Sequence, residues 1–510
     1  MTFEIVFVLL SLLGMVAALI ADKMRPGMIL FSVVVLFLCA GILTPKEMLE
    51  GFSNKGMITV ALLFLVSEGI RQSGTLGQVI KKLLPQGKTT VFKAQLRILP
   101  SVAFISAFLN NTPVVVIFAP IIKHWAKSVN LPATKFLIPL SYVTILGGIC
   151  TLIGTSTNLV VHGMILEAGF EGFSMFELGK VGIFIAIAGI IYIFLFSKRL
   201  LPDARPDTAV PDEEVEEGEK LHRVEAVLGA RFPGINKKLK DFNFQRHYGA
   251  EVKEIKTRNG QRFVSNLEEV VLHEGDTLVV MADDTFIPTW GESSVFVLLT
   301  NGNEPDTTGK KKRWFALLLL VLMIVGATVG ELPITKEMFP DIKLDMFFFV
   351  SITTIIMAWT NLFPARKYTK YISWDILITI ACAFAISKAM VNSGVADSVA
   401  KFIIGLSDDY GPHVLLAMVF IITNLFTELI TNNAAAALAF PLALSISAQL
   451  GVSPTPFFVV ICMAASASFS TPIGYQTNLI VQGIGNYKFT DFVRIGLPLN
   501  ILTFIISVIL

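Results

Sequence analysis

Charged residues are scarce in this 510-residue sequence: they make up 16% of the chain, whereas 54% of its residues are hydrophobic and its mean hydropathy is +0.69. Soluble proteins carry about 25% charged residues, so this shortage excludes an ordinary soluble protein. The net charge is only +2, which argues against a nucleic-acid partner. The composition therefore predicts an integral membrane protein.

Cysteine is also rare. The four cysteines, Cys39, Cys150, Cys382 and Cys462, lie in apolar stretches at no metal-ligand spacing, so neither a disulfide framework nor a zinc site is indicated. No His/Cys/Asp cluster and no pair of nucleophile and base lies in the apolar segments. We therefore expect neither an enzyme nor an organic cofactor.

The charges that are present gather in one segment. Residues 198–312 hold 17 basic and 21 acidic residues, enough chain for a small water-soluble domain inside a membrane protein. The predicted organisation is a first membrane repeat at 1–197, an acidic linker at 198–220, an α/β module at 221–292, a second linker at 293–312, and a second membrane repeat at 313–510.

Apolar segments long enough to cross about 30 Å of hydrocarbon predict the membrane spans. The run at 3–21 could be a cleaved signal peptide, but its basic residues Lys23 and Arg25 follow the apolar stretch, which favours a retained helix. Further spans are expected near 27–43, 56–71, 133–168, 177–197, 314–330, 344–361, 373–390, 456–487 and 492–510.

Two other apolar pieces, 92–123 and 412–447, carry a polar triplet in the middle, at 110–112 and 431–433. Each half is expected to be about 15 residues, too short to span, which suits a re-entrant hairpin. Basic residues accumulate in loops that fall on one side if crossings alternate, which predicts a cytoplasmic α/β module and both termini outside.

An internal repeat relates the two halves at an offset of 320 or 321 residues. Gly154 maps to Gly474 and Asn158 to Asn478 at 320, whereas Asn111 maps to Asn432 at 321. With five crossings and one hairpin per copy, the second copy starts from the opposite side of the membrane. Such inverted repeats are typical of secondary transporters.

The polar knots predict four breaks in the helices: the two hairpin tips and the stretches 154–158 and 474–478. Broken backbone survives at membrane depth only where it is buried or lines a cavity. Helix N-termini at a break favour an anion, and carbonyl ends favour a cation. No lysine or arginine lies in a break, so helix ends, neutral donors and co-bound cations would have to hold an anion.

Two alternatives stay open from the residues alone. Asn and Thr in a membrane helix can merely bond a neighbouring helix, although two pairs of knots at matched spacing favour a site. Glu428, the one acid beside a knot, could be a proton or cation group, or a member of a structural network.

These motifs resemble the divalent anion/sodium symporters, which carry dicarboxylates, citrate or sulfate. Members have a Ser-Asn-Thr triplet at each hairpin tip, and the matching triplets here read Asn110-Asn111-Thr112 and Thr431-Asn432-Asn433. The resemblance implies an all-α polytopic membrane protein with an inverted repeat, two re-entrant hairpins and broken helices. It also implies a transport domain that moves as an elevator against a homodimer scaffold.

The resemblance also implies site residues. One sodium ion would meet Ser106, Asn110, Asn111 and Gly154, and another Thr427, Ile430, Asn432 and Gly474. The anion would meet Asn111, Thr112, Thr157, Thr431, Asn432, Asn433 and Gln476. Thr157 and Gln476 replace prolines often found in the family, and Asn110 and Asn433 replace a serine and a threonine of the triplets.

The soluble segment predicts short strands at 223–228, 252–255 and 277–281 and one helix. It resembles the C-terminal module of the regulator-of-potassium-conductance family, through Arg246–Ala250 and Leu272–Asp276. Such modules often dimerise and sometimes bind a small nucleotide, which the resemblance implies as an effector; a passive structural role is the alternative. The sequence has no Gly-rich dinucleotide loop.

The function predicted from these features is sodium-coupled import of a small divalent anion across a bacterial inner membrane, with at least two sodium ions and sulfate as the favoured substrate. A C4-dicarboxylate or citrate is the alternative substrate. A channel gated by the module and a sodium/proton antiporter using Glu428 are the alternatives of another class.

Overall fold

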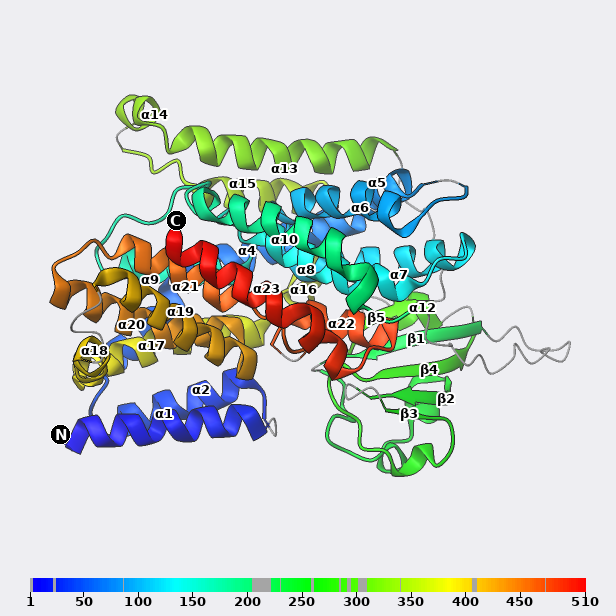
Figure 1. The fold of residues 1–510 in the computed structure, drawn as a ribbon, viewed down its shortest axis with the longest axis horizontal. Coiled ribbons are helices and arrows are strands. Elements are labelled where there is room, and N and C mark those ends of the chain that lie inside the picture. Colours follow the sequence, from blue (N-terminus) through cyan, green and yellow to red (C-terminus); the bar gives the residue numbers. More distant parts are fainter. Residues whose placement is uncertain are drawn as a thin grey trace, which may run out of the picture.

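The computed structural model describes residues 3–21, 24–85, 87–203, 222–229, 231–257, 261–283, 286–290, 295–300, 310–339, 341–405, 411–472 and 474–510. The predicted acidic run at 212–219 lies outside these ranges. Within them the chain forms a long bundle of helices and one small sheet, which lies at one end of the bundle (Figure 1).

The first half of the chain contributes ten helices to the bundle. They are α1 (Phe3–Ala21), α2 (Pro26–Cys39), α3 (Pro45–Glu50), α4 (Lys55–Gln72), α5 (Thr75–Leu83), α6 (Val91–Ser106), α7 (Asn111–Ser128), α8 (Leu137–Gly148), α9 (Ser156–Glu167) and α10 (Gly179–Leu200).

The second half contributes α13 (Lys310–Gly330), α14 (Pro333–Met338), α15 (Met346–Trp359), α16 (Tyr368–Tyr371), α17 (Trp374–Asn392), α18 (Val395–Gly405), α19 (Pro412–Leu429), α20 (Asn432–Leu450), α21 (Thr455–Ser466), α22 (Gln476–Gly485) and α23 (Phe489–Ile509). By length and composition, eight helices of the described chain could cross a membrane. The prediction of an integral multi-pass membrane protein is confirmed at that level.

Breaks are present at the four predicted places, but the two long ones end earlier than predicted. Residues 156–158 and 476–478 form the first turns of α9 and α22, because Thr155 and Tyr475 are the extended N-cap residues of these helices. Helices end and restart at 107–110, 149–155, 430–431 and 467–475, apart from Ile473, which is outside the described residues. Two helices that flank a tip are longer than predicted: α19 has 18 residues and α20 has 19, and both could span by length. The expectation of halves too short to span is wrong for this pair, because α20 continues to the left-handed Gly451.

The sheet has five antiparallel strands in the order β3-β2-β4-β1-β5. They are β1 (His222–Leu228), β2 (Glu251–Lys256), β3 (Arg262–Phe263), β4 (Thr277–Ala282) and β5 (Phe296–Thr300), with short helices α11 (Phe244–Tyr248) and α12 (Phe286–Trp290). The strand β5 falls in the segment predicted to be a linker, because it pairs with β1 some seventy residues earlier. A separate apolar cluster that includes Val224, Leu278 and Phe296 packs this part.

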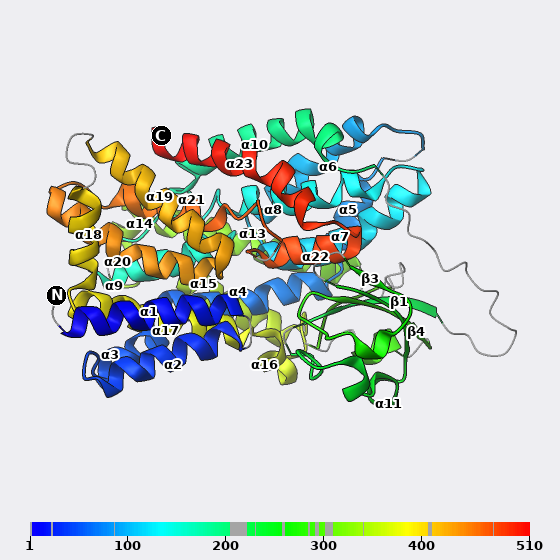
Figure 2. The same cartoon turned by 60° about the horizontal axis from the view of Figure 1, so that its bottom comes forward.

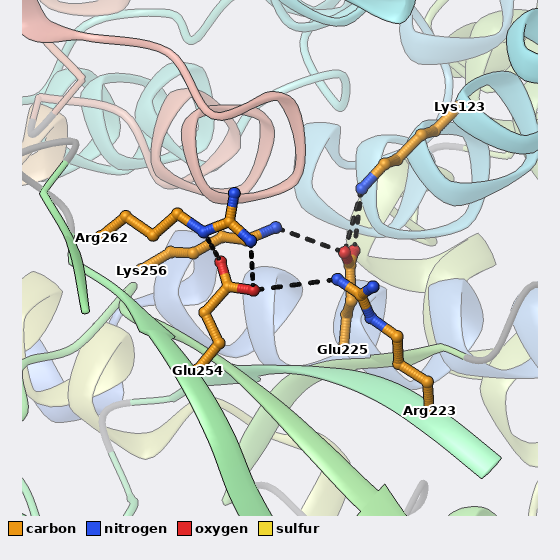
Figure 3. A network of polar contacts seen from close by, with 6 residues as sticks. All are labelled: Lys123, Arg223, Glu225, Glu254, Lys256 and Arg262. Atoms are coloured by element: carbon orange, nitrogen blue, oxygen red, sulfur yellow. Dashed lines mark hydrogen bonds and ion pairs between the residues drawn. The ribbon is translucent and has the colours of Figure 1, made fainter. Parts of the chain in front are cut away.

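The sheet contacts the ends of α7 and α22, and these two helices lie side by side next to it (Figure 2). An ionic network joins the sheet to α7, as Figure 3 shows. Lys123 on α7 lies 3.0 and 3.1 Å from the two carboxylate oxygens of Glu225 on β1, and Lys256 on β2 lies 3.5 Å from Glu225. Glu254 pairs in turn with Arg262 and, at 3.9 Å, with Arg223. The sheet is thus fastened to a helix that begins at a break.

Candidate binding site at the helix breaks

Four helices begin at the breaks and pack in two cross-repeat pairs. The helices α7 and α20 start at Asn111 and Asn432, and α9 and α22 start at Ser156 and Gln476. The helix α7 packs against α22, and α20 packs against α9. The free N–H groups at these starts carry partial positive charge, so their convergence favours a bound anion.

Asn111 is the centre of the first break and is 1% exposed. The amide orientation that satisfies both of its atoms directs the nitrogen to Ser106 Oγ (2.9 Å), the Thr144 carbonyl (3.1 Å) and the Gly154 carbonyl (3.3 Å). The amide oxygen then accepts from the Tyr475 hydroxyl at 2.5 Å. Three members of the predicted first sodium set, Ser106, Asn111 and Gly154, are therefore together.

The fourth member, Asn110, lies elsewhere. It lines a small crevice together with Ser156 and apolar side chains of α4 and α13, including Val60 and Leu320. Asn110 is the N-cap residue of α7, but its side chain makes no capping hydrogen bond.

The second break repeats the arrangement of the first. Thr427 Oγ1 donates to Asn432 Oδ1 at 2.9 Å. The equivalent pair 321 residues earlier, Ser106 Oγ and the Asn111 amide, is also bonded at 2.9 Å, with the amide nitrogen as the donor. Gly474 approaches the Thr427 carbonyl so closely that an added Cβ would lie 2.7 Å from that oxygen. Ile430 follows the last residue of α19, so its carbonyl belongs to the helix end.

The loops of the two long breaks are held in the same way. Asn158 Nδ2 donates to the Thr151 carbonyl (2.9 Å), and Asn478 Nδ2 donates to the Thr471 carbonyl (3.2 Å). The repeat at 320 residues, inferred from residue types, thus recurs in the hydrogen bonds of the breaks.

The predicted anion-binding side chains meet across the repeats. Thr112 Oγ1 donates to Gln476 Oε1 at 3.2 Å, and Thr157 Oγ1 donates to Asn433 Oδ1 at 3.2 Å. The hydroxyl of Thr431 is shielded from solvent and has no hydrogen-bond partner among the described residues. An unpaired buried hydroxyl costs free energy, so a ligand that accepts its proton would fit there.

Tyr475 is the functional candidate that the sequence reasoning missed. Its hydroxyl bonds Asn111 at 2.5 Å and Thr155 Oγ1 at 3.0 Å, and the side chain of Asn432 lies beside it. The asparagines of both tips therefore converge on one phenol oxygen. The available signal was a hydroxyl-bearing aromatic residue within a polar break, at the position that corresponds to Thr155.

Glu428 belongs to a network that braces the second long break. Its carboxylate accepts from the Ser470 N–H (3.0 Å), Thr471 Oγ1 (2.7 Å), Ser468 Oγ (3.3 Å) and Asn500 Nδ2 (2.7 Å). All four donors are neutral. The carboxylate thereby ties the loop that precedes Gly474 to α23, which favours the structural-network alternative.

The chemistry of both clusters suits a hard, weakly held cation. Hydroxyl and carbonyl oxygens line both clusters, and the Asn432 amide oxygen joins the second, whereas the Asn111 amide must turn its oxygen inward to bind a cation. Such oxygen sets bind hard cations. Among the described residues, no group of three or more His, Cys, Asp or Glu residues could hold a metal ion. Neutral oxygen clusters at the ends of broken helices are typical of transported ions rather than of a resident metal.

Comparison with known proteins gives three likenesses. The sequence profile of CitMHS, the citrate transporter family, matches residues 16–448 and 338–510. An uncharacterized transporter of Synechocystis, sll0640, is 30% identical over 92% of this chain and 90% of the relative. A probable sodium/sulfate cotransporter 3 of Chlamydomonas reinhardtii is 23% identical over 96% of this chain and 86% of the relative.

Among solved structures, the YdaH transporter of Alcanivorax borkumensis is similar to the whole chain. The TM-score is 0.53, the two sequences are 12% identical, and the likeness covers 97% of that protein. At this identity the likeness concerns the fold alone.

Proposed function

The chain belongs to the citrate transporter family, and on that premise we propose that it imports a small divalent anion together with sodium ions, with sulfate as the preferred substrate. The observation that carries the proposal is the pair of repeat-related breaks, whose asparagines converge on Tyr475 and whose helix starts face one another. The name of the Chlamydomonas relative supports sodium and sulfate as the transported pair.

Two sodium sites supply the charge balance. Importing an anion against an inside-negative potential costs about 2.3 kcal/mol per charge per 100 mV. A divalent anion moved with two sodium ions carries no net charge. The first ion would meet Ser106, Asn111 and Gly154, and the second Thr427, Ile430, Asn432 and Gly474, with Asn110 as a further candidate for the first.

The finer features of the mechanism are part of the same proposal. The two halves form an inverted repeat, the tips belong to a transport domain that moves as an elevator, and the scaffold is a homodimer. The five-stranded sheet is a cytoplasmic regulatory module, with a small nucleotide as its candidate effector, and the protein resides in a bacterial inner membrane.

The test is uptake of radiolabelled sulfate into proteoliposomes with an imposed inward sodium gradient. Uptake is expected to require sodium and to fall at least tenfold in Asn111→Ala and in Asn432→Ala, because each change removes an amide that lines a proposed cation cluster and lies next to the Tyr475 hydroxyl. Asn392→Ala, at an exposed helix end, is the matched control. Uptake of equal rate without sodium would contradict the coupling.

Citrate is the second candidate substrate, because the family profile carries that description. Inhibition of radiolabelled sulfate uptake by citrate, succinate and malate distinguishes sulfate from citrate as the substrate. If citrate inhibits this uptake at a lower concentration than unlabelled sulfate does, the carboxylate is favoured.

A further inference from the structure

We propose that Tyr475 is the specificity-determining residue of the site: its ring restricts the site to compact tetrahedral oxyanions, and its hydroxyl is a hydrogen-bond donor to them. The inference rests on the proposed function and adds to it the feature by which the site distinguishes sulfate from longer carboxylates. Tyr475 is the N-cap residue of α22, directly after Gly474, and its side chain is 8% exposed.

Tyr475 departs from the symmetry of the two repeats. The position equivalent to Tyr475 in the first repeat is Thr155, and the two hydroxyls lie 3.0 Å apart. A threonine at 475 would make this centre symmetric. The phenol instead extends a rigid ring into the space between the two hairpin tips. The site therefore contains one large aromatic side chain where a symmetric site would contain two threonines.

The surroundings hold the phenol oxygen in place. It bonds Asn111 of the first tip and lies beside Asn432 of the second, and the Asn111 amide itself packs against Gly148, where an added Cβ would lie 2.5 Å from the nearest amide atom. Close-packed interiors resist displacement of such a group. The ring therefore occupies the midpoint of the site as a fixed wall.

Other polar groups of the site also pair across the repeats, Thr112 with Gln476 and Thr157 with Asn433. Sulfate carries both of its charges on one tetrahedral centre, so it can accept from convergent donors on one side of the ring. A C4-dicarboxylate or citrate separates its charges along a carbon chain that the ring would have to displace.

The hydroxyl contributes affinity for the bound anion. A phenol O–H rotates to suit its acceptor, so the proton now given to Asn111 can be given to a bound oxyanion. Sulfate and carboxylate oxygens both accept such a proton, so the ring and not the hydroxyl separates the two classes of anion.

Two variants separate the ring from the hydroxyl. Tyr475→Phe keeps the ring and removes the donor, and Tyr475→Thr removes the ring, keeps a hydroxyl and restores the residue found at Thr155. Binding of sulfate, succinate and citrate to purified protein in saturating sodium is measured by calorimetry. Tyr192→Phe, which removes a phenol hydroxyl bonded to Ile495 outside the breaks, is the control.

The wild type is expected to bind sulfate at least tenfold more tightly than succinate or citrate. Tyr475→Phe should weaken sulfate binding at least tenfold with the order of the anions unchanged, and Tyr475→Thr should reduce the preference for sulfate at least tenfold. The phenylalanine variant keeps the shape of the side chain and so decides the donor role even if the threonine variant does not fold.

Three outcomes would overturn the inference. A wild-type protein that prefers succinate or citrate would show that the site does not select sulfate. If Tyr475→Thr keeps the wild-type selectivity and Tyr475→Phe keeps the wild-type affinity for sulfate, the proposed function stands but Tyr475 has no role in it. A wild type that binds none of the anions with sodium overturns the proposed function and the inference with it.

Discussion

At the residue scale, neutral side chains hold the broken backbone of this protein together. Asn158 and Asn478 donate to carbonyls of their own loops, and Asn111 and Asn432 turn their amides toward cation clusters. Unpaired carbonyls cost several kcal/mol in hydrocarbon, so an amide that satisfies them stabilises a break. Glycine completes the two long breaks, at Gly154 and Gly474, because only a residue without Cβ allows the segments to approach so closely.

Gly154→Ala tests that close approach. An added Cβ would lie 2.5 Å from the Gly148 carbonyl oxygen and 2.7 Å from its Cα, so backbone must move, at about 1–3 kcal/mol for an overpacked site. Because the Gly154 carbonyl belongs to the first proposed sodium site, we expect the sodium concentration for half-maximal uptake to rise at least fivefold. Gly14→Ala, with open space around it, should leave sodium dependence unchanged.

At the element scale, the ends of helices decide where the site forms. The tip at 107–110 could be predicted to within a few residues, because Asn111 and Pro113 suit a helix start in an otherwise apolar stretch. The contact of Tyr475 with Asn111 of the first tip could not, since it joins residues 364 positions apart and composition carries no such information. The strand β5 was missed for the same reason, because its partner is distant in sequence.

Helix ends outside the site also depend on single side chains. Lys135 is 3% exposed, and its amine donates to the carbonyls of Lys198 (2.8 Å) and Leu201 (2.5 Å) where α10 ends, and pairs with Asp203 at 3.1 Å. A cation at the C-terminal end of a helix satisfies its free carbonyls and its negative dipole pole.

Lys135→Met should therefore destabilise the protein by about 1.5–3 kcal/mol, the usual worth of hydrogen bonds to a charged group. Thermal unfolding in detergent is the measurement, and Lys127→Met, an exposed lysine near the end of α7, is the control. Equal melting temperatures for the two variants would show that the Lys135 amine contributes nothing to the end of α10.

At the scale of the whole molecule, the sheet and the site are connected through α7. That helix begins at Asn111 in the first break and carries Lys123, which pairs with Glu225 of the sheet. Burial alone would raise the pKa of Glu225, but Lys123 and Lys256 outweigh burial and hold this pKa at about 2. The carboxylate is therefore charged at every physiological pH.

The sign of the pH dependence follows from that lowered pKa. A carboxyl whose pKa is lower in the folded protein than in the unfolded chain stabilises above its unfolded pKa, near 4.5, and loses this contribution as the pH falls toward 2. Glu225→Gln should lower the melting temperature equally between pH 5 and pH 8, and the difference from wild type should shrink below about pH 4.5.

The exposed pair of Glu251 and Lys253 provides the control, since Glu251→Gln should change the melting temperature little at any pH. A double-mutant cycle of Glu225→Gln with Lys123→Met should give a coupling of about 0.5–3 kcal/mol. No coupling would mean that the sheet is held to α7 by apolar contacts alone.

The central claim is that two repeat-related breaks form one site for an anion and its sodium ions. The most direct measurement is an electron cryomicroscopy map of the protein in sodium and selenate, a heavier tetrahedral analogue of sulfate, compared with a map in potassium. We expect sodium-dependent density beside Tyr475, between the tips at 110–112 and 431–433. Density at a place remote from both tips, or identical maps in the two salts, would contradict the account.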